Sequence, residues 1–243
     1  MSKIIKFKST KQYIDLKKYY PKPIKVNLPE WYKKLKHTPQ NFTVKGCMPF
    51  LETLTTGYVL FLPQDLHLKH NIYSSDNATT LMEPSFQDSY EVIRENLNKK
   101  GKLDVHSITQ IFKSPLAKKN LNLPVHKINN PWIIETPPGY SCLFVPPLNN
   151  SNDKFSIIPG IVNTDLYKQE INFPFVVNGD KYHVLDEILN AGTAYVQIIP
   201  FKRDSWEMTI EENNKDLNLF RINFIHKLIN RYKEFTWEKS KWK

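Results

Sequence analysis

Runs of apolar residues interrupted by turn-forming residues dominate the middle of the chain. Residues 195–201 form the clearest strand-like run, and the earlier run of residues 57–63 is apolar at nearly every position, as in a strand covered on both faces. Residues 65–70 alternate between apolar and polar and read as a continuing strand or a hairpin partner. Strand-like runs recur at intervals of about ten residues, which predicts an antiparallel sandwich or barrel.

Proline and glycine punctuate these runs in ways that predict specific turns. Pro137-Pro138-Gly139 stands between the runs 130–136 and 140–145, and two fixed φ angles followed by a permissive glycine predict a turn with a returning strand. Pro159-Gly160 lies inside the run 155–162 and predicts a bulge or an edge strand.

A second turn signal predicts a hairpin. Asn178-Gly179-Asp180 separates the apolar run 171–177 from residues 182–185. Asn-Gly between two strand-like runs is typical of a tight hairpin turn.

Helical spacing is found near both ends of the chain. Residues 28–35 predict a short helix with Pro29 in its first turn and Trp31 and Leu35 on one face. Residues 215–233 place apolar side chains at helical spacing and predict a C-terminal amphipathic helix. The polar stretch 71–104 predicts a loop with a short helix near residues 90–98.

The expected fold is therefore mainly β, an antiparallel jelly-roll or cupin-like sandwich or barrel with a short N-terminal helix and a C-terminal amphipathic helix. At 243 residues and 40% hydrophobic content, one globular domain is the simplest expectation. We expect a basic N-terminal region at residues 1–36 that packs on the domain, a β core at 43–210 and a C-terminal helix at 215–233.

Charge is concentrated at the N-terminus. The basic N-terminal region holds eleven lysines against Asp15 and Glu30, a net +9 out of +10 for the whole chain. Such a surface attracts phosphate backbones, but lysine dominates over arginine and no known docking motif occurs. A solvated basic surface is the simplest interpretation, with an acidic protein partner or nucleic acid as alternatives.

The cysteines and the hydropathy pattern bear on location. Cys47 and Cys142 show neither metal-site spacing nor a disulfide framework, which suits a reducing compartment. The sequence contains no long hydrophobic segment, so no membrane partner is expected. We expect a cytoplasmic protein, in the host cytoplasm if it is viral.

Eight polar residues near predicted strand ends are candidates to line a ligand pocket, because binding sites in such folds collect there. Arg203 could hold a carboxylate or phosphate, and Tyr140 or Tyr167 could stack on a ring. The alternative is that Arg203 forms a structural ion pair with Asp165, Asp204 or Glu207. The candidates are His106, Gln110, Glu135, Tyr140, Asp165, Tyr167, Gln197 and Arg203.

Several short motifs resemble an uncharacterised family encoded by tailed bacteriophages and some bacteria. They are Pro137-Pro138-Gly139-Tyr140-Ser141, Pro146-Pro147-Leu148-Asn149, residues 160–165, Phe173-Pro174-Phe175, Gly192-Thr193 and residues 197–207. The strand order also looks like the double-stranded β-helix of cupins. The resemblance implies phage origin and no known function.

Cupin-like barrels often hold Fe(II) with two histidines and a carboxylate. No His-x-Asp or His-x-Glu motif occurs here, and Gln197 and Arg203 stand on the late strand expected to supply a second histidine. We therefore expect no metal or cofactor and a non-catalytic binding or assembly protein, able to form homo-oligomers and to bind a small ligand or a protein.

Two alternatives remain open. One is an atypical oxygenase-class enzyme, with Fe(II) as its cofactor and a site built from His106, Glu135, Asp165 and Gln197. The other is a nucleic-acid binder that uses its lysines. Serine or cysteine hydrolases and phosphate-loop proteins are not supported, because their motifs are absent.

Overall fold

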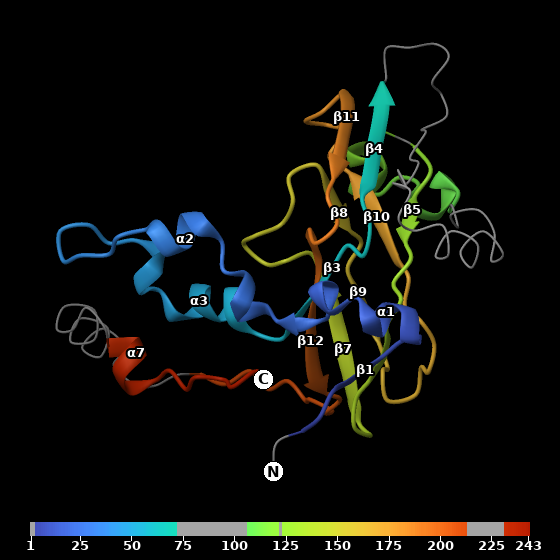
Figure 1. Cartoon of the computed structure of the whole chain (residues 1–243). Helices are drawn as coiled ribbons and strands as arrows, with labels where there is room; N and C mark the ends of the chain where they lie inside the picture. The colour runs from blue at the N-terminus through green and yellow to red at the C-terminus, as the bar shows by residue number, and fades with distance from the viewer. Residues whose placement is uncertain (1–2, 72–105, 122, 213–230) are drawn as a thin grey trace.

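The computed structural model describes residues 3–71, 106–121, 123–212 and 231–243, and shows a mainly β protein with several small helices. Antiparallel strands form a β core, and a group of helices projects from its side (Figure 1). The helices are α1 (Lys11–Asp15), α2 (Glu30–Lys34), α3 (Met48–Thr55), α5 (Pro115–Lys119) and α7 (Arg231–Phe235).

The longest strand, β12 (Ala194–Lys202), lies at the centre of a five-stranded sheet. It follows the predicted run of residues 195–201, and four consecutive residues, from Tyr195 to Ile198, are buried because both faces are covered. The sheet order is β2 (Lys22–Pro23), β3 (Tyr58–Phe61), β12, β7 (Tyr140–Val145) and β9 (Gly160–Val162).

A three-stranded sheet faces it, in the order β5 (His126–Ile128), β10 (Phe173–Val177) and β8 (Phe155–Ile157). The Phe173 ring of β10 lies 5.3 Å from the Phe144 ring and 5.7 Å from the Tyr195 ring, measured between centroids. These contacts join the two sheets through one hydrophobic core, which also contains the buried thiol of Cys142.

Two separate ribbons complete the β structure. In one, β1 (Lys6–Lys8) pairs with β6 (Ile133–Glu135), and in the other β4 (Leu66–Asn71) pairs with β11 (Val184–Leu189). The strand predicted at residues 65–70 is present, but β11 is its partner rather than the preceding strand β3.

The turn at Pro137-Pro138-Gly139 is present, with φ of +81° at Gly139, but the strands on its two sides do not pair with each other. β6 pairs with β1, whereas β7 pairs with β12 and β9. The run 155–162 is likewise divided at Pro159, with β8 in one sheet and β9 at the edge of the other.

The predicted hairpin at Asn178-Gly179-Asp180 is wrong, because β10 pairs with β5 and β8 while β11 pairs with β4. Gly179 is instead buried, and its N–H donates to the Lys119 carbonyl at 2.9 Å. A Cβ at this position would lie 2.3 Å from Cγ of Leu121. The glycine is therefore required by close packing and not by a hairpin turn.

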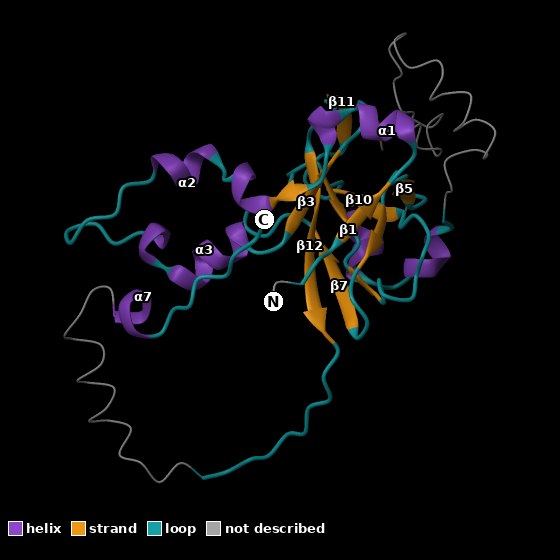
Figure 2. Ribbon diagram, turned by 60° about the horizontal axis from the view of Figure 1, so that its bottom comes forward, coloured by secondary structure: helices purple, strands orange, loops and turns teal. Residues whose placement is uncertain are grey.

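Helices α2, α3 and α7 lie together beside the β core and are called here the helical lobe, residues 30–55 and 231–237 (Figures 1 and 2). The predicted helix at 28–35 corresponds to α2, but its buried residue is Tyr32, which stacks on Phe50, while Trp31 remains 47% exposed. Exposed Cys47 precedes α3.

The C-terminal residues return from the helical lobe to the β core. Nε1 of Trp237 donates to Glu52 at 2.7 Å, and the Trp242 ring lies 5.8 Å from the ring of Tyr58. The short helix expected near 90–98 and most of the helix expected at 215–233 lie outside the described residues. No helix within the described ranges has the length and apolar character needed to cross a membrane.

Candidate functional site

Three polar sequence signatures meet at one end of the five-stranded sheet. Two parallel hydrogen bonds join Arg203 to Asp165, from Nη1 to Oδ1 at 2.8 Å and from Nη2 to Oδ2 at 2.5 Å. Nη1 also donates to the Tyr140 carbonyl at 3.0 Å and to Oγ of Ser141 at 2.9 Å. We call these residues, with Gly139 and Asn163, the Asp165–Arg203 cluster.

The backbone brings the cluster together. Arg203 directly follows β12, and its N–H donates to the Gly139 carbonyl at 2.9 Å. The Gly139 N–H in turn donates to Oδ2 of Asp165 at 2.8 Å. Ser141 donates to Oδ1 of Asn163 at 2.8 Å, so the turns at 137–139 and 163–165 are bonded to the end of β12.

The electrostatics of the pair fit an internal role. The Asp165 side chain is only 5% exposed, and hydrogen bonds from Arg203 and Gly139 lower the pKa of its carboxyl to about 2. The same bond raises the pKa of Arg203. Both carboxylate oxygens and both guanidinium Nη atoms have partners within the protein, so this geometry matches the structural ion pair rather than an open anion site.

Tyr140 extends the cluster toward the N-terminus. Its hydroxyl accepts a hydrogen bond from the Lys3 amine, and that amine lies 4.3 Å from the ring centroid. A cation from its own chain thus occupies the hydroxyl end of the ring that the sequence predicts to stack on a ligand.

Gln197 lies elsewhere, on β12 about 20 Å from Arg203 at the usual rise of a strand. Its side chain is fully buried, and Nε2 donates to the carbonyls of Thr53 at 3.0 Å and Thr56 at 2.7 Å. Oε1 accepts from the Leu148 N–H at 2.9 Å. Gln197 therefore bonds the end of α3 and the turn after β7 to the central strand.

The other four candidates occupy separate places. Glu135 forms an ion pair with Lys8 at 2.7 Å, which lowers the pKa of its carboxyl. His106 forms a backbone bridge with Val125. Gln110 is exposed on a short 3-10 helix (Ile108–Ile111), and Tyr167 is 41% exposed after the turn at 163–165. The four residues of the alternative oxygenase site thus have four different sets of partners.

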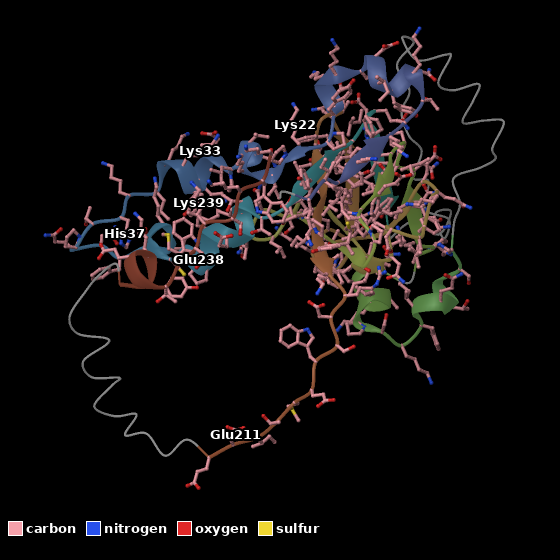
Figure 3. The ribbon with its side chains drawn as sticks, turned by 90° about the horizontal axis from the view of Figure 1, so that it is seen from below. Lys22, Lys33, His37, Glu211, Glu238 and Lys239 are labelled. Atoms are coloured by element: carbon pink, nitrogen blue, oxygen red, sulfur yellow. The ribbon has the colours of Figure 1, made fainter. Side chains whose placement is uncertain are left out.

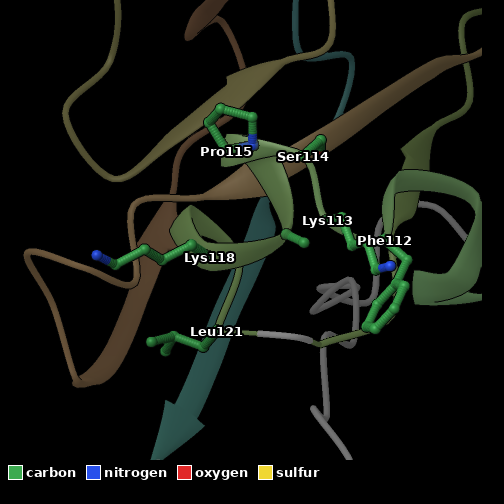
Figure 4. A pocket seen from close by; sticks show the side chains of 7 residues that line it. Phe112, Lys113, Ser114, Pro115, Lys118 and Leu121 are labelled. Carbon is green, nitrogen blue, oxygen red and sulfur yellow. The ribbon is translucent and has the colours of Figure 1, made fainter.

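An open hollow of about 760 Å³ lies beside α5, and no candidate residue lines it (Figure 4). Its wall combines exposed Phe112 with two lysines. The lining residues are Phe112, Lys113, Ser114, Pro115, Ala117, Lys118 and Leu121.

The core contains buried polar groups that the sequence pattern did not single out. Burial lowers the pKa of His126 and raises that of Tyr195, and neither side chain hydrogen-bonds to another described residue. Each stands at a strand position where the sequence pattern predicts a buried residue. The pattern therefore predicts that the side chain is buried but does not mark it as a functional group. In the described ranges, no three His, Cys, Asp or Glu side chains are grouped as a metal site would require.

The chain matches no protein-family model and no curated protein.

Proposed function

We propose that this chain is a non-catalytic binding or assembly protein, of the phage type that its motifs resemble and with a cupin-like β core. One observation carries the proposal. Trp206, Met208 and Ile210 follow one another at alternate positions after β12, and they are 90%, 85% and 88% exposed. A single exposed apolar side chain is ordinary, whereas a row of three large ones is typical of an interaction surface.

The polar residues support the same proposal. Asp165, Arg203 and Gln197, three of the pocket candidates, direct their polar atoms to other groups of the protein. The exposed apolar side chains of Trp206, Met208 and Ile210, which have no partner among the described residues, lie outside the Asp165–Arg203 cluster.

Sedimentation equilibrium of the purified chain over a wide concentration range tests assembly. The chain mass is 28.6 kDa, and we expect a defined larger species as concentration rises. A folded chain whose mass stays at the monomer value at every concentration would contradict the assembly role.

A second candidate function is binding of single-stranded nucleic acid by the helical lobe. Trp31 is 47% exposed and makes edge contacts with Tyr32 and Phe50, at 5.7 and 6.1 Å between ring centroids. Lys34 and Lys36 are exposed nearby in the sequence. An exposed ring beside lysines offers base stacking and phosphate contact together.

Fluorescence anisotropy of a labelled single-stranded oligonucleotide distinguishes this candidate. We expect Trp31→Ala or Lys34→Gln with Lys36→Gln to weaken binding, and each lost phosphate contact to reduce the salt slope by about 0.7. Lys113→Gln with Lys118→Gln removes the same charge beside α5 and serves as control. Equal weakening by both lysine pairs would indicate non-specific attraction and contradict a site on the helical lobe.

A further inference from the structure

The residues after β12 form an extended segment that no other described part of the protein covers. Residues 204–212, called here the arm, leave the end of the sheet and run away from the β core (Figure 2). Trp206, Met208 and Ile210 alternate with Glu207, Thr209 and Glu211. In an extended chain this alternation places the apolar side chains on one face and the polar ones on the other.

The backbone of the arm is unpaired among the described residues. No hydrogen bond joins residues 205–212 to any other residue in the described part of the chain. Unpaired N–H and C=O groups on an amphipathic extended segment are what an edge strand needs in order to add a neighbour.

Charge indicates which surface the arm would meet. The arm carries Asp204, Glu207, Glu211 and Glu212 and no lysine or arginine, so the remainder of the +10 chain carries +14. Most of this positive charge is in the basic N-terminal region. Asp204 pairs with Lys202 at the base of the arm, whereas Glu211 lies far from Lys22 and Lys33 of its own chain (Figure 3).

One strand of the basic N-terminal region fits the arm in both pairing and pattern. β1 pairs with β6 on one side and with no described strand on the other. Lys6 and Lys8 are exposed, while Phe7 between them packs against the hydrophobic core with Ile5. A strand added at this edge would place its carboxylates beside the lysines and its apolar face beside Phe7 and Ile5.

We propose that the arm of one copy adds as an antiparallel strand to the free edge of β1 in a second copy, and that the copies exchange arms in a closed assembly. This inference rests on the proposed assembly function and specifies that the partner of the arm is a second copy of the same chain. Reciprocal exchange pairs the backbone groups of the arm and of the free β1 edge in every copy, and the assembly is then closed, as symmetric oligomers usually are.

The experiment compares the sedimentation of the full chain with that of two matched variants. In the first, Trp206→Ser, Met208→Ser and Ile210→Ser remove the apolar face of the arm, and we expect a monomer that still unfolds cooperatively, at a lower midpoint because association no longer stabilises it. In the control, Phe112→Ser and Leu166→Ser change side chains that are 65% and 72% exposed elsewhere, and the oligomer should persist. An oligomer that survives loss of the arm's apolar face overturns this inference but leaves the assembly function intact, whereas a wild-type chain that is monomeric throughout overturns both.

A charge exchange tests the receiving strand. We expect Lys6→Glu alone and Glu207→Lys alone each to weaken association by about tenfold, because like charges then face each other. Mixing the two variants restores opposite charges across the interface and should recover a mixed oligomer. Failure of the mixture to recover association, with both variants folded, would overturn β1 as the receiving edge.

Discussion

At the scale of single residues, polar side chains connect distant segments of this chain by hydrogen-bonding to their main-chain groups. Asp165 accepts the Gly139 N–H, and Gln197 satisfies three backbone groups contributed by α3 and by the turn after β7. Both residues were predicted to line a pocket, because a polar residue near a strand end looks the same in sequence whether it serves a ligand or a neighbouring loop. What distinguishes the two roles is the set of partners, which depends on tertiary structure.

The Asp165 carboxyl should make stability depend on pH in the acid range. Its pKa is lowered from the ordinary 3.8 to about 2 in the folded protein, so its stabilising contribution is present above the ordinary value and is lost as pH falls toward 2. Urea unfolding of wild type and Asp165→Asn from neutral pH downward should show a difference that is constant above about pH 5 and shrinks below it.

Asp180→Asn is the matched control, since Asp180 is exposed and has no hydrogen bond through its side chain among the described residues. A difference between wild type and Asp165→Asn that stays constant down to pH 2 would be inconsistent with the ion pair.

Gln197 provides a second test at this scale. Gln197→Met keeps the side-chain volume but leaves the Leu148 N–H and the Thr53 and Thr56 carbonyls without their partner. We expect the free energy of unfolding to fall by about 3 kcal/mol. The same substitution at exposed Gln110 should change it by less than about 0.5 kcal/mol, and equal effects at both positions would contradict the bonding role.

At the scale of elements, alternation and turn residues located most strands but not their partners. The run 195–201 became β12, and β4, β6 and β7 also lie where the pattern predicted them. Pairing failed where a local turn signal had another cause, as at Gly179, whose position is decided by Leu121 and Lys119 more than fifty residues earlier. Contacts of that kind are fixed by packing and leave no mark on local periodicity.

Gly57, in the turn before β3, can be compared with Gly139 to separate two reasons for a glycine. One is close packing against a neighbouring strand, and the other is a positive φ. Gly57 has φ of +82°, and a Cβ there would lie 2.1 Å from the Ile198 carbonyl oxygen; Gly139 has φ of +81°, with no atom within 4 Å of its Cβ position. Gly139→Ala should cost about 1 kcal/mol for its backbone conformation alone. Gly57→Ala must also displace β12 and should cost about 3 kcal/mol or more, so similar thermal unfolding midpoints for the two variants would be the contrary result.

At the scale of the whole molecule, the C-terminal residues connect the helical lobe to the β core. Trp237 bonds to Glu52 of α3, and Trp242 packs against Tyr58 of β3. The first contact lies within the helical lobe and the second joins the segment that follows the lobe to the β core, so residues 237–242 couple the two parts of the protein.

Replacing Trp237 and Trp242 by Ala should loosen this connection while leaving the two-sheet core in place. We expect amide hydrogens of α3 to exchange at least about tenfold faster, with little change in β12, as measured by mass spectrometry. Lys239→Gln alters the same segment without removing an aromatic contact and should leave the exchange of α3 unchanged. Uniform acceleration across α3 and β12 would instead mean that these tryptophans support global stability.

The two cysteines of this chain differ in a way that has a practical consequence. Burial raises the pKa of Cys142 to about 11, whereas Cys47 is exposed at the start of α3. Because thiolate and access together govern alkylation, a maleimide dye added to the unaltered folded protein should attach at Cys47 alone. The native chain thus carries a built-in attachment point for a spectroscopic reporter on the helical lobe, and no engineered cysteine is needed to follow that lobe during assembly.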